Sequence, residues 1–283
     1  MPSCCIIADN AAQFTRVNFP ETISLRFINF KTEYSFLNPK DPNKEKLPEF
    51  PRQLPLGHPP IISLPEHDEI SQIIESSVNN FDDVFILMHS RELNPAYDLV
   101  AGLLAKIRGR AAIHLIDTQS LSIGQGYLIQ SAIDMIKQHV DGFSIEQRLR
   151  EQVPHVYTLL CSSGFSYLHA SGFIDAGQSV VGEMSSLIPI FSLEEGKFTP
   201  IDKLKNSHGV IEYFLEYIDE FDDLLQVSFL QSTPPSLQEA RTIKQYVEEN
   251  YPDTIYTEHP HNNYLTSLIG PKGFGIVVIE KAE

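Results

Sequence analysis

The sequence predicts an α/β protein built in two parts, and three observations support this. In the first half of the 283-residue chain, short apolar runs alternate with amphipathic segments, which is typical of a largely parallel sheet with helical crossovers. Near Pro154 the character changes, and a β-hairpin signal and separate helical segments follow. An apolar fraction of 42% and a charged fraction of 20% indicate a folded chain long enough for two cores. We therefore expect an N-terminal α/β domain over residues 1–153 and a C-terminal α+β domain over residues 154–283.

Apolar runs and helical spacing locate the elements of the first domain. The expected strands cover residues 5–8, 23–30, 84–88 and 113–116. The expected helices cover residues 66–78, 94–107 and 127–139. The stretch 38–65 is rich in proline and polar residues, so it predicts an irregular excursion.

The second domain shows a mixed pattern of strands and helices. Its expected strands cover residues 156–160, 190–193, 197–201, 225–230 and 276–279. Its expected helices cover residues 180–186, 208–217 and 236–249. The Glu194-Glu195-Gly196 stretch between two short strands predicts a β-hairpin turn.

Charge and cysteine content narrow the class of protein. A net charge of -16 argues against binding to nucleic acid or anionic membranes, which requires clustered Lys and Arg. The three cysteines, Cys4, Cys5 and Cys161, cannot all pair and lack metal-ligand spacing, so we expect reduced thiols and no metal. Neither a signal peptide nor an apolar run near the roughly 20 residues of a membrane span is present. We expect a cytoplasmic protein with no integral membrane segment.

The turn at residues 117–126, DTQSLSIGQG, joins an expected strand to a helix that we expect to begin near Gly126. The third glycine of a dinucleotide fingerprint and the Gly-Lys-Ser/Thr of a Walker loop are missing, which disfavours a nucleotide. Two interpretations remain. Backbone amides at the helix start could hold another anion. Alternatively, Asp117 and Ser120 hydrogen-bond the turn while Gly124 and Gly126 supply its backbone angles.

Three further stretches allow both a functional and a structural interpretation. Ser90, after the strand at 84–88, lies near backbone amides that could hold an anion, whereas Asn94 could simply cap the next helix. His259-Pro260-His261 has no third ligand for zinc, so we expect an exposed loop. The glycines of 268–277 permit either close approach to a ligand or a tight turn.

Taken in order, these stretches resemble the DegV family of bacterial lipid-binding proteins. The family's opening strand and Asp-Ser are similar to residues 6–12, and its Asp-Ser-x-x-x-Ser-x-Gly-x-Gly segment is similar to residues 117–126. Further similarities lie in Tyr-Leu-x-x-Gly-Gly-Arg-Ile, Lys-Pro-Ile, Leu-x-x-Gly-Lys-x-x-Pro and His-Thr-Gly-Pro-Gly-x-x-Gly, at residues 167–174, 188–190, 193–200 and 268–275. The resemblance spans nearly the whole chain.

The resemblance implies a two-domain fold with a fatty acid in an apolar tunnel between the domains. It implies a lipid-binding protein that is not an enzyme, needs no cofactor and in some members presents the lipid carboxylate to a separate fatty acid kinase. The candidate carboxylate-binding residues are Ser90 and Asn94, at the serine positions of the family's Ser-Ser-x-Leu-Ser-Gly-Thr-Tyr motif. His58 and Arg91, which stand where the family has other residues, are the candidate substitutes for its lost donors. The implied head-group wall is Asp117, Ser120, Gly124 and Gly270. The implied acyl-chain lining is Leu168, Phe173, Leu187, Ile188 and Leu268.

The chain departs from the family pattern at the head group. The family's Thr-Ser-Gln-Pro-Ser falls on residues 56–60, the arginine of Gly-Gly-Arg-Ile is Phe173, and the histidine of His-Thr-Gly-Pro-Gly is Leu268. Three hypotheses follow. The chain binds a fatty acid; or it also supports its phosphorylation, with Arg91 and His58 replacing the lost groups; or its head-group site has degenerated, with Phe173 and Leu268 filling it, and it acts in regulation or protein binding.

Overall fold

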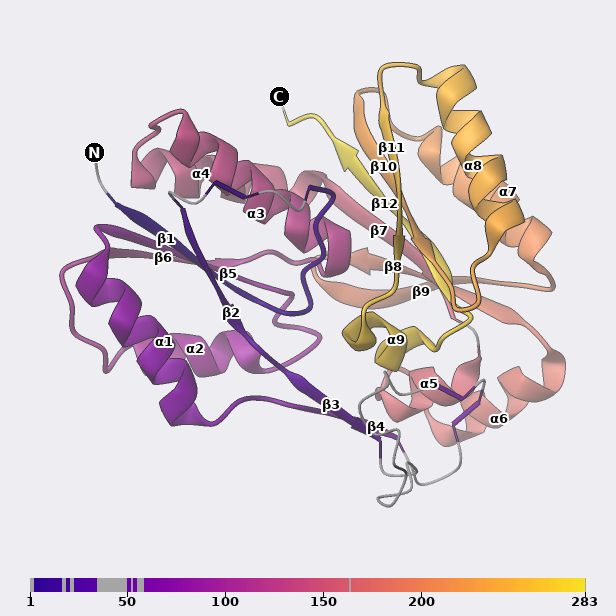
Figure 1. Ribbon diagram of the computed structural model, residues 1–283. Coiled ribbons are helices and arrows are strands. Elements are labelled where there is room, and N and C mark those ends of the chain that lie inside the picture. The colour runs from indigo at the N-terminus through magenta and orange to yellow at the C-terminus, as the bar shows by residue number, and fades with distance from the viewer. Residues whose placement is uncertain are drawn as a thin grey trace.

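The computed structural model describes residues 3–16, 19–20, 23–34, 50–51, 53–54, 59–162 and 164–282. Within them the chain forms two halves, each built on its own main sheet (Figure 1). All strands of the first main sheet precede Val153, and all strands of the second follow it. The predicted two-domain α/β class is confirmed, and the boundary at residue 153 stays a prediction.

Four of the described strands form the first sheet, and neighbouring strands all run parallel, in the order β2-β1-β5-β6. They are β1 (Cys4–Asp9), β2 (Ser24–Ile28), β5 (Asp83–Met88) and β6 (Ala112–Asp117). β1 and β5 lie in the middle, where the apolar runs are buried under helices on both faces. The carboxyl ends of parallel strands meet at one edge, which places Asp9 next to His89.

Helices cover both faces of this sheet (Figure 1). α1 (His67–Asn80) and α2 (Ala96–Leu104) lie on one face, and α3 (Ser122–Lys137) and α4 (Gly142–Gln152) lie on the other. α1 turns Ile70, Ile74 and Val78 inward, at the four-residue spacing that puts side chains on one face of a helix. α3 contacts β1 and β5 of the first sheet and β7 and β12 of the second, so it is buried along most of its length.

Six of the described strands form the second sheet, in the order β11-β10-β12-β7-β8-β9. They are β7 (Val156–Cys161), β8 (Ile188–Glu194), β9 (Lys197–Leu204), β10 (Leu224–Gln231), β11 (Ile255–Pro260) and β12 (Phe274–Glu280). Only the β10–β11 pair among them is parallel. α7 (Ser207–Ile218) and α8 (Leu237–Asn250) pack on the face away from the first domain, over Phe229 and Phe274 (Figure 1).

The remaining elements lie outside the two main sheets and the helices described above. They are the antiparallel pair β3 (Lys31–Tyr34) and β4 (Pro60–Ser63), the short helix η1 (Val153–His155), α5 (Phe165–Ala170), α6 (Ala176–Ser185) and α9 (Asn263–Ile269). The Asp175 side chain accepts from the backbone N–H of Gln178, and the Gln178 side chain accepts from that of Asp175. This capping box defines the start of α6.

The structure differs from the sequence prediction in four respects. α3 begins at Ser122 rather than near Gly126, so both glycines lie inside the helix. The sequence pattern also missed β3, α4, α5, β11 and α9. His259-Pro260-His261 is not an exposed loop: His259 and Pro260 belong to β11, and both histidines are partly buried. β4 falls in the stretch expected to be irregular.

The apolar core extends from one half into the other. The largest buried cluster joins Ile7 and Phe85 of the first sheet to Leu230 and Val277 of the second. None of the helices among the described residues combines the length and apolar character that crossing a membrane requires.

Candidate functional site

The turn at residues 117–126 is held by a hydrogen bond within it and by one from the backbone of Arg91. The Asp117 carboxylate accepts from the backbone N–H of Gln119 at 2.9 Å and from that of Arg91 at 3.4 Å. Burial raises the pKa of Asp117, and these hydrogen bonds oppose that shift. Left-handed backbone occurs at Gln119 and Ser122, with φ of 48° and 53°, and not at the two glycines. The expectation that the glycines supply the turn angles is therefore wrong.

The glycines of this segment permit close packing instead. A Cβ at Gly126 would overlap the carbonyl of Gln13, and one at Gly124 would overlap the Ser120 hydroxyl and approach Val156 at 2.8 Å. Ser120 is buried, and its hydroxyl has no hydrogen-bond partner among the described residues. The amino-terminal turn of α3 is thus filled by protein on both sides.

Ser90 joins the two domains. Its hydroxyl donates to the carbonyl of Gly196 at 2.7 Å and accepts from the backbone N–H of Glu92 at 3.2 Å. Gly196 sits in the β8–β9 turn with φ of 81°, and a Cβ there would overlap the Ser90 hydroxyl. Ser90 is fully buried, and the hydrogen bond that its hydroxyl donates goes to the second domain.

The other predicted carboxylate contacts also have protein partners. The Asn94 side chain accepts from the backbone N–H of Ala96 at 2.9 Å, but Pro95 is the N-cap of α2, so Asn94 lies one residue before the predicted capping position. The Arg91 guanidinium donates to Asp98 at 2.8 Å and lies over the ring of Tyr97, with half of its side chain exposed. His58 lies outside the described residues. The assignment of these four residues to a carboxylate stays a prediction.

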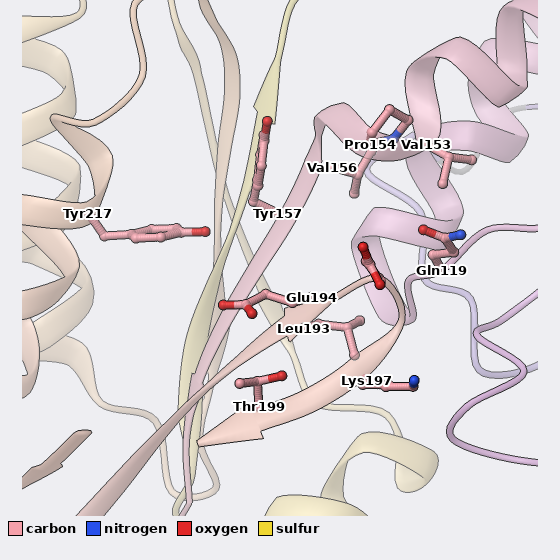
Figure 2. A pocket seen from close by; sticks show the side chains of 11 residues that line it. Gln119, Val153, Pro154, Val156, Tyr157, Leu193, Glu194, Lys197, Thr199 and Tyr217 are labelled. Carbon is pink, nitrogen blue, oxygen red and sulfur yellow. The ribbon is translucent and has the colours of Figure 1, made fainter. Parts of the chain in front are cut away.

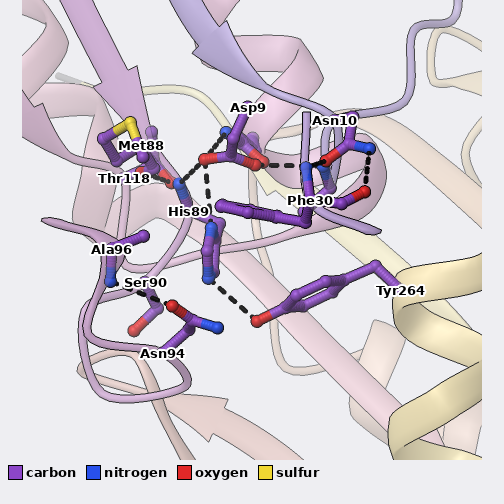
Figure 3. Close-up of polar contacts among 12 residues, drawn as sticks. Asp9, Asn10, Phe30, Met88, His89, Ser90, Asn94, Ala96, Thr118 and Tyr264 are labelled. Carbon is purple, nitrogen blue, oxygen red and sulfur yellow. Dashed lines mark hydrogen bonds and ion pairs between the residues drawn. The ribbon is translucent and has the colours of Figure 1, made fainter. Parts of the chain in front are cut away.

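A buried chain of hydrogen bonds crosses between the domains beside Ser90 (Figure 3). The Asp9 carboxylate accepts from the backbone N–H of His89 at 2.8 Å, and it lies 3.0 Å from the His89 Nδ1. It also accepts from the Gln125 amide and from the backbone N–H of Ala11. The His89 Nε2 lies 2.9 Å from the hydroxyl of Tyr264, which is 175 residues away along the chain.

The donors and acceptors of this chain can be assigned. Three N–H groups already donate to the Asp9 carboxylate, which therefore acts as an acceptor, so the His89 Nδ1 that faces it carries the proton. In the neutral imidazole, the Nε2 then accepts from the Tyr264 hydroxyl. Burial raises the pKa of Tyr264, which keeps that hydroxyl protonated. Polar residues at the ends of the two central strands signal the Asp9–His89 pair in the sequence, whereas no local pattern marks Tyr264.

An apolar cavity of about 680 Å³ lies in the second domain between α5, α6 and the β8–β9 hairpin. Its walls include Phe165, Phe173, Val181, Leu187, Phe191 and Ile201. Two residues of the predicted acyl lining, Phe173 and Leu187, are among them. Leu168 is buried in the adjoining cluster with Phe165 and Phe191. The ring of Phe173 meets that of Phe198 edge-on at 4.7 Å.

The remaining predicted lining and wall residues lie elsewhere. Ile188 packs against the cluster under α7 and α8, on the other face of the second sheet. Leu268 is buried in the large core cluster that spans both halves. Gly270 ends α9 with φ of 80°, a left-handed angle that suits glycine, so its role includes closing that helix.

A second cavity, of about 580 Å³, lies beside Gln119 of the turn and is more polar (Figure 2). Glu194, Glu195, Tyr157 and Tyr217 line it. Figure 2 shows the Glu194 carboxylate on the same side of this cavity as the Tyr217 hydroxyl. Its lining holds the two carboxylates Glu194 and Glu195 against one lysine, Lys197, so its net negative charge would repel the head group of a fatty acid. Among the described residues, no group of three His, Cys, Asp or Glu side chains is placed to hold a metal ion.

These features define a two-domain α/β protein with an apolar cavity in its second domain and a closed hydrogen-bond network between the domains. A family model described as an uncharacterised protein of the DegV family matches residues 46–281. The chain therefore belongs to the DegV family. This confirms the resemblance in its sequence.

Curated relatives share low identity with the chain. A DegV domain-containing protein of Caldanaerobacter subterraneus is 23% identical over 179 residues, covering 63% of this chain and 64% of the relative. One from Staphylococcus aureus strain COL is 21% identical over 172 residues, covering 60% of this chain and 62% of the relative. The chain thus matches somewhat less than two thirds of the length of these relatives.

Solved structures share the fold over the full chain. A fatty acid binding DegV family protein from Streptococcus agalactiae superposes with a TM-score of 0.78 at 15% identity, covering 99% of this chain and 100% of that one. The Fatty Acid Kinase B3 protein of Streptococcus pneumoniae, loaded with linoleic acid, gives 0.79 at 12% identity with the same coverage. A DegV family protein of Eubacterium eligens, loaded with heptadecanoic acid, gives 0.78 at 11% identity, covering 98% and 100%.

Proposed function

We propose that this protein binds one long-chain fatty acid, with the acyl chain in the cavity between α5, α6 and the β8–β9 hairpin. The observation that carries the proposal is that cavity: about 680 Å³, walled by phenylalanine, valine, leucine and isoleucine side chains. Small-molecule sites are typically about 300–1,000 Å³. Each methylene removed from water contributes about 0.8 kcal/mol, so the chain alone can supply high affinity. The solved relatives loaded with linoleic and heptadecanoic acid support the ligand class.

The proposed role is binding and presentation of a ligand rather than catalysis by this chain. The Fatty Acid Kinase B3 relative supports a separate kinase as the partner. Replacement of the family arginine by Phe173 and of the family histidine by Leu268 removes groups that would stabilise a developing acyl phosphate. We therefore propose that this chain has kept lipid binding. Support for phosphorylation of the bound lipid is a separate property, for which a separate experiment is given below. A cytoplasmic location is proposed from the sequence. Burial raises the pKa of the Cys161 thiol to about 12, so this thiol stays protonated and unreactive.

The second candidate is a DegV-like protein whose head-group site has been filled, so that it serves in regulation or protein binding. Two observations favour it. Phe173 packs edge-on against Phe198, and the Ser90 hydroxyl is engaged by Gly196, so aromatic rings and a hydrogen bond occupy the region between the domains.

Lipid extraction and native mass spectrometry of the purified protein test the proposal. We expect a stoichiometric acyl ligand. Val181→Trp should reduce the bound lipid, because Val181 lines the cavity. Val180→Trp is the matched control on the same helix, because Val180 is 56% exposed and does not line the cavity. A protein that is reproducibly empty and takes up no added fatty acid would instead favour the second candidate.

Phosphorylation is tested separately. The purified protein, a fatty acid kinase catalytic subunit, ATP and hexadecanoate are combined, and acyl phosphate is measured. Product no greater than that of a kinase-only control, from a protein that still binds hexadecanoate, would assign this chain to lipid binding alone.

A further inference from the structure

The apolar cavity has a buried floor and an exposed mouth. Phe165 and Phe191 on the floor are 6% and 3% exposed. Val181 of α6 and Ile201 of β9, which also line the cavity, are 64% and 38% exposed. The mouth therefore opens to solvent between α6 and β9, and the floor lies under α5.

The side of the cavity that faces the first domain is closed by aromatic rings. Phe173 contacts Phe198 at a centroid distance of 4.7 Å, and Phe191 lies 6.3 Å from Phe198. Phe198 follows the β8–β9 turn, where Ser90 is hydrogen-bonded to Gly196. An acyl chain that enters this cavity from the solvent side therefore meets aromatic rings before Ser90.

The register of the β8–β9 hairpin places a lysine at the mouth. Pro189 pairs with Lys203 and Phe191 pairs with Pro200, and a bulge between these pairs inserts one extra residue in β9. Because of the bulge, Lys203 lies on the same face as Pro200, and both line the cavity. Asp202 also borders the cavity, but it pairs with Ile190, whose side chain belongs to the cluster on the other face.

Lys203 is exposed and forms no ion pair with the described residues, and it is the only Lys or Arg among the lining residues. Gln178 and Ser185 of α6 add polar groups to the same lining. The Asp202 carboxylate accepts from the backbone N–H of Lys203 at 2.6 Å and forms no ion pair with the Lys203 ammonium. Arg91, the cation expected to serve the head group, is engaged by Asp98 outside this cavity.

We infer that Lys203 holds the anionic head of the bound amphiphile at the mouth of the cavity, with the acyl chain running inward to Phe165 and Phe191. The inference rests on the proposed lipid-binding function and specifies its orientation. The carboxylate then faces solvent between α6 and β9 and does not reach Ser90. Recognition combines one charge at the surface with apolar burial below it.

Binding of hexadecanoate and of hexadecanol to the full-length protein tests this orientation, with displacement of a fluorescent fatty acid as the measurement. Lys203→Glu should weaken hexadecanoate by about fivefold or more, because an exposed attraction becomes a repulsion. The affinity of Lys203→Glu for hexadecanol, which has no charge, should lie within about twofold of that of the unmodified protein. The affinity of Lys203→Gln for hexadecanoate should lie between those of Lys203→Glu and the unmodified protein. Lys205→Glu is the matched control, since it makes the same charge change beyond the end of β9.

The possible outcomes separate the inference from the function on which it rests. If Lys203→Glu binds hexadecanoate as well as the unmodified protein does, while Arg91→Glu weakens it, the head lies between the domains and the inference is overturned. If Lys203→Glu and Lys205→Glu weaken hexadecanoate equally, general charge explains the effect and the inference is again overturned. If the unmodified protein binds neither compound, the proposed function itself fails.

Discussion

Replacing Tyr264 with phenylalanine removes one hydroxyl from the buried chain that links Asp9, His89 and Tyr264. The ring would stay in place, because it packs against Phe30 with a centroid distance of 5.9 Å and against His89 at 4.9 Å. The His89 Nε2 would lose the partner that lies 2.9 Å away. Both side chains are almost fully buried, with exposures of 4% for Tyr264 and 1% for His89, so water cannot readily replace the hydroxyl.

A buried acceptor left without a partner costs about 1–3 kcal/mol. We therefore expect Tyr264→Phe to lower the free energy of unfolding by about 2 kcal/mol, with little change in the dependence on urea concentration. Far-UV circular dichroism during urea titration is the appropriate assay, because the chain contains no tryptophan.

Tyr246→Phe is the matched control. It also deletes a tyrosine hydroxyl, one that donates to Asp219 at an exposed site, and we expect a change within about 0.5 kcal/mol. The reasoning would be refuted if Tyr264→Phe were as mild as this control, because the His89 Nε2 would then not depend on the Tyr264 hydroxyl.

Three further predictions concern packing and titration. Gly126→Ala should destabilise the protein by about 2 kcal/mol or more in the same urea assay, since its Cβ would overlap the carbonyl of Gln13, whereas Gly102→Ala, with open space around it, should be neutral or slightly stabilising. Burial lowers the pKa of His261 from 6.5 to about 4, so its contribution to stability is full above pH 6.5 and is lost as the pH falls toward 4; His261→Gln should flatten the fall in unfolding free energy across that window. Burial raises the pKa of Asp117 above its ordinary value of 3.8, so ionisation of this carboxyl lowers the stability of the folded state as the pH rises. Asp117→Asn keeps the acceptor oxygen and cannot ionise. It should be at least as stable as the unmodified protein at pH 7 and should lose that advantage in acid.

Much of the fold follows from local patterns in the chain. The strands β1 and β5 are apolar throughout because they are buried on both faces, and such runs are visible in one sequence. α7 and α8 were predicted almost to their ends from helical spacing. α9 was missed because its seven residues fall between glycines and polar residues that also suit a turn.

The start of α3 was misplaced for a different reason. Gly124 and Gly126 are typical of a turn, but here they lie in a helix, because Gln13 and Val156 approach too closely for any side chain. Glycine is needed both where distant segments approach closely and where a turn takes a left-handed backbone angle, so the sequence looks the same in both cases. The two causes can be separated only when the neighbours are known.

Some features of the candidate site also follow from the sequence alone. The order of motifs along the chain was enough to predict the DegV family and, with it, a fatty acid as the ligand class. It also predicted Phe173 and Leu187 as acyl-chain lining; both line the apolar cavity, and their contact with a lipid stays a prediction. These conclusions depend on which residues occur and in what order, and a single sequence contains that information.

The tertiary structure alone decided which polar groups are engaged. Ser90 is bonded to Gly196, which lies 106 residues away, and the partner of His89 lies 175 residues away. A bulge in β9 brings Lys203 to the face that lines the cavity. Hydrogen-bond partners and strand registers of this kind are set by the packing of the two halves against each other. The residues around Ser90 carry no local pattern that reveals them.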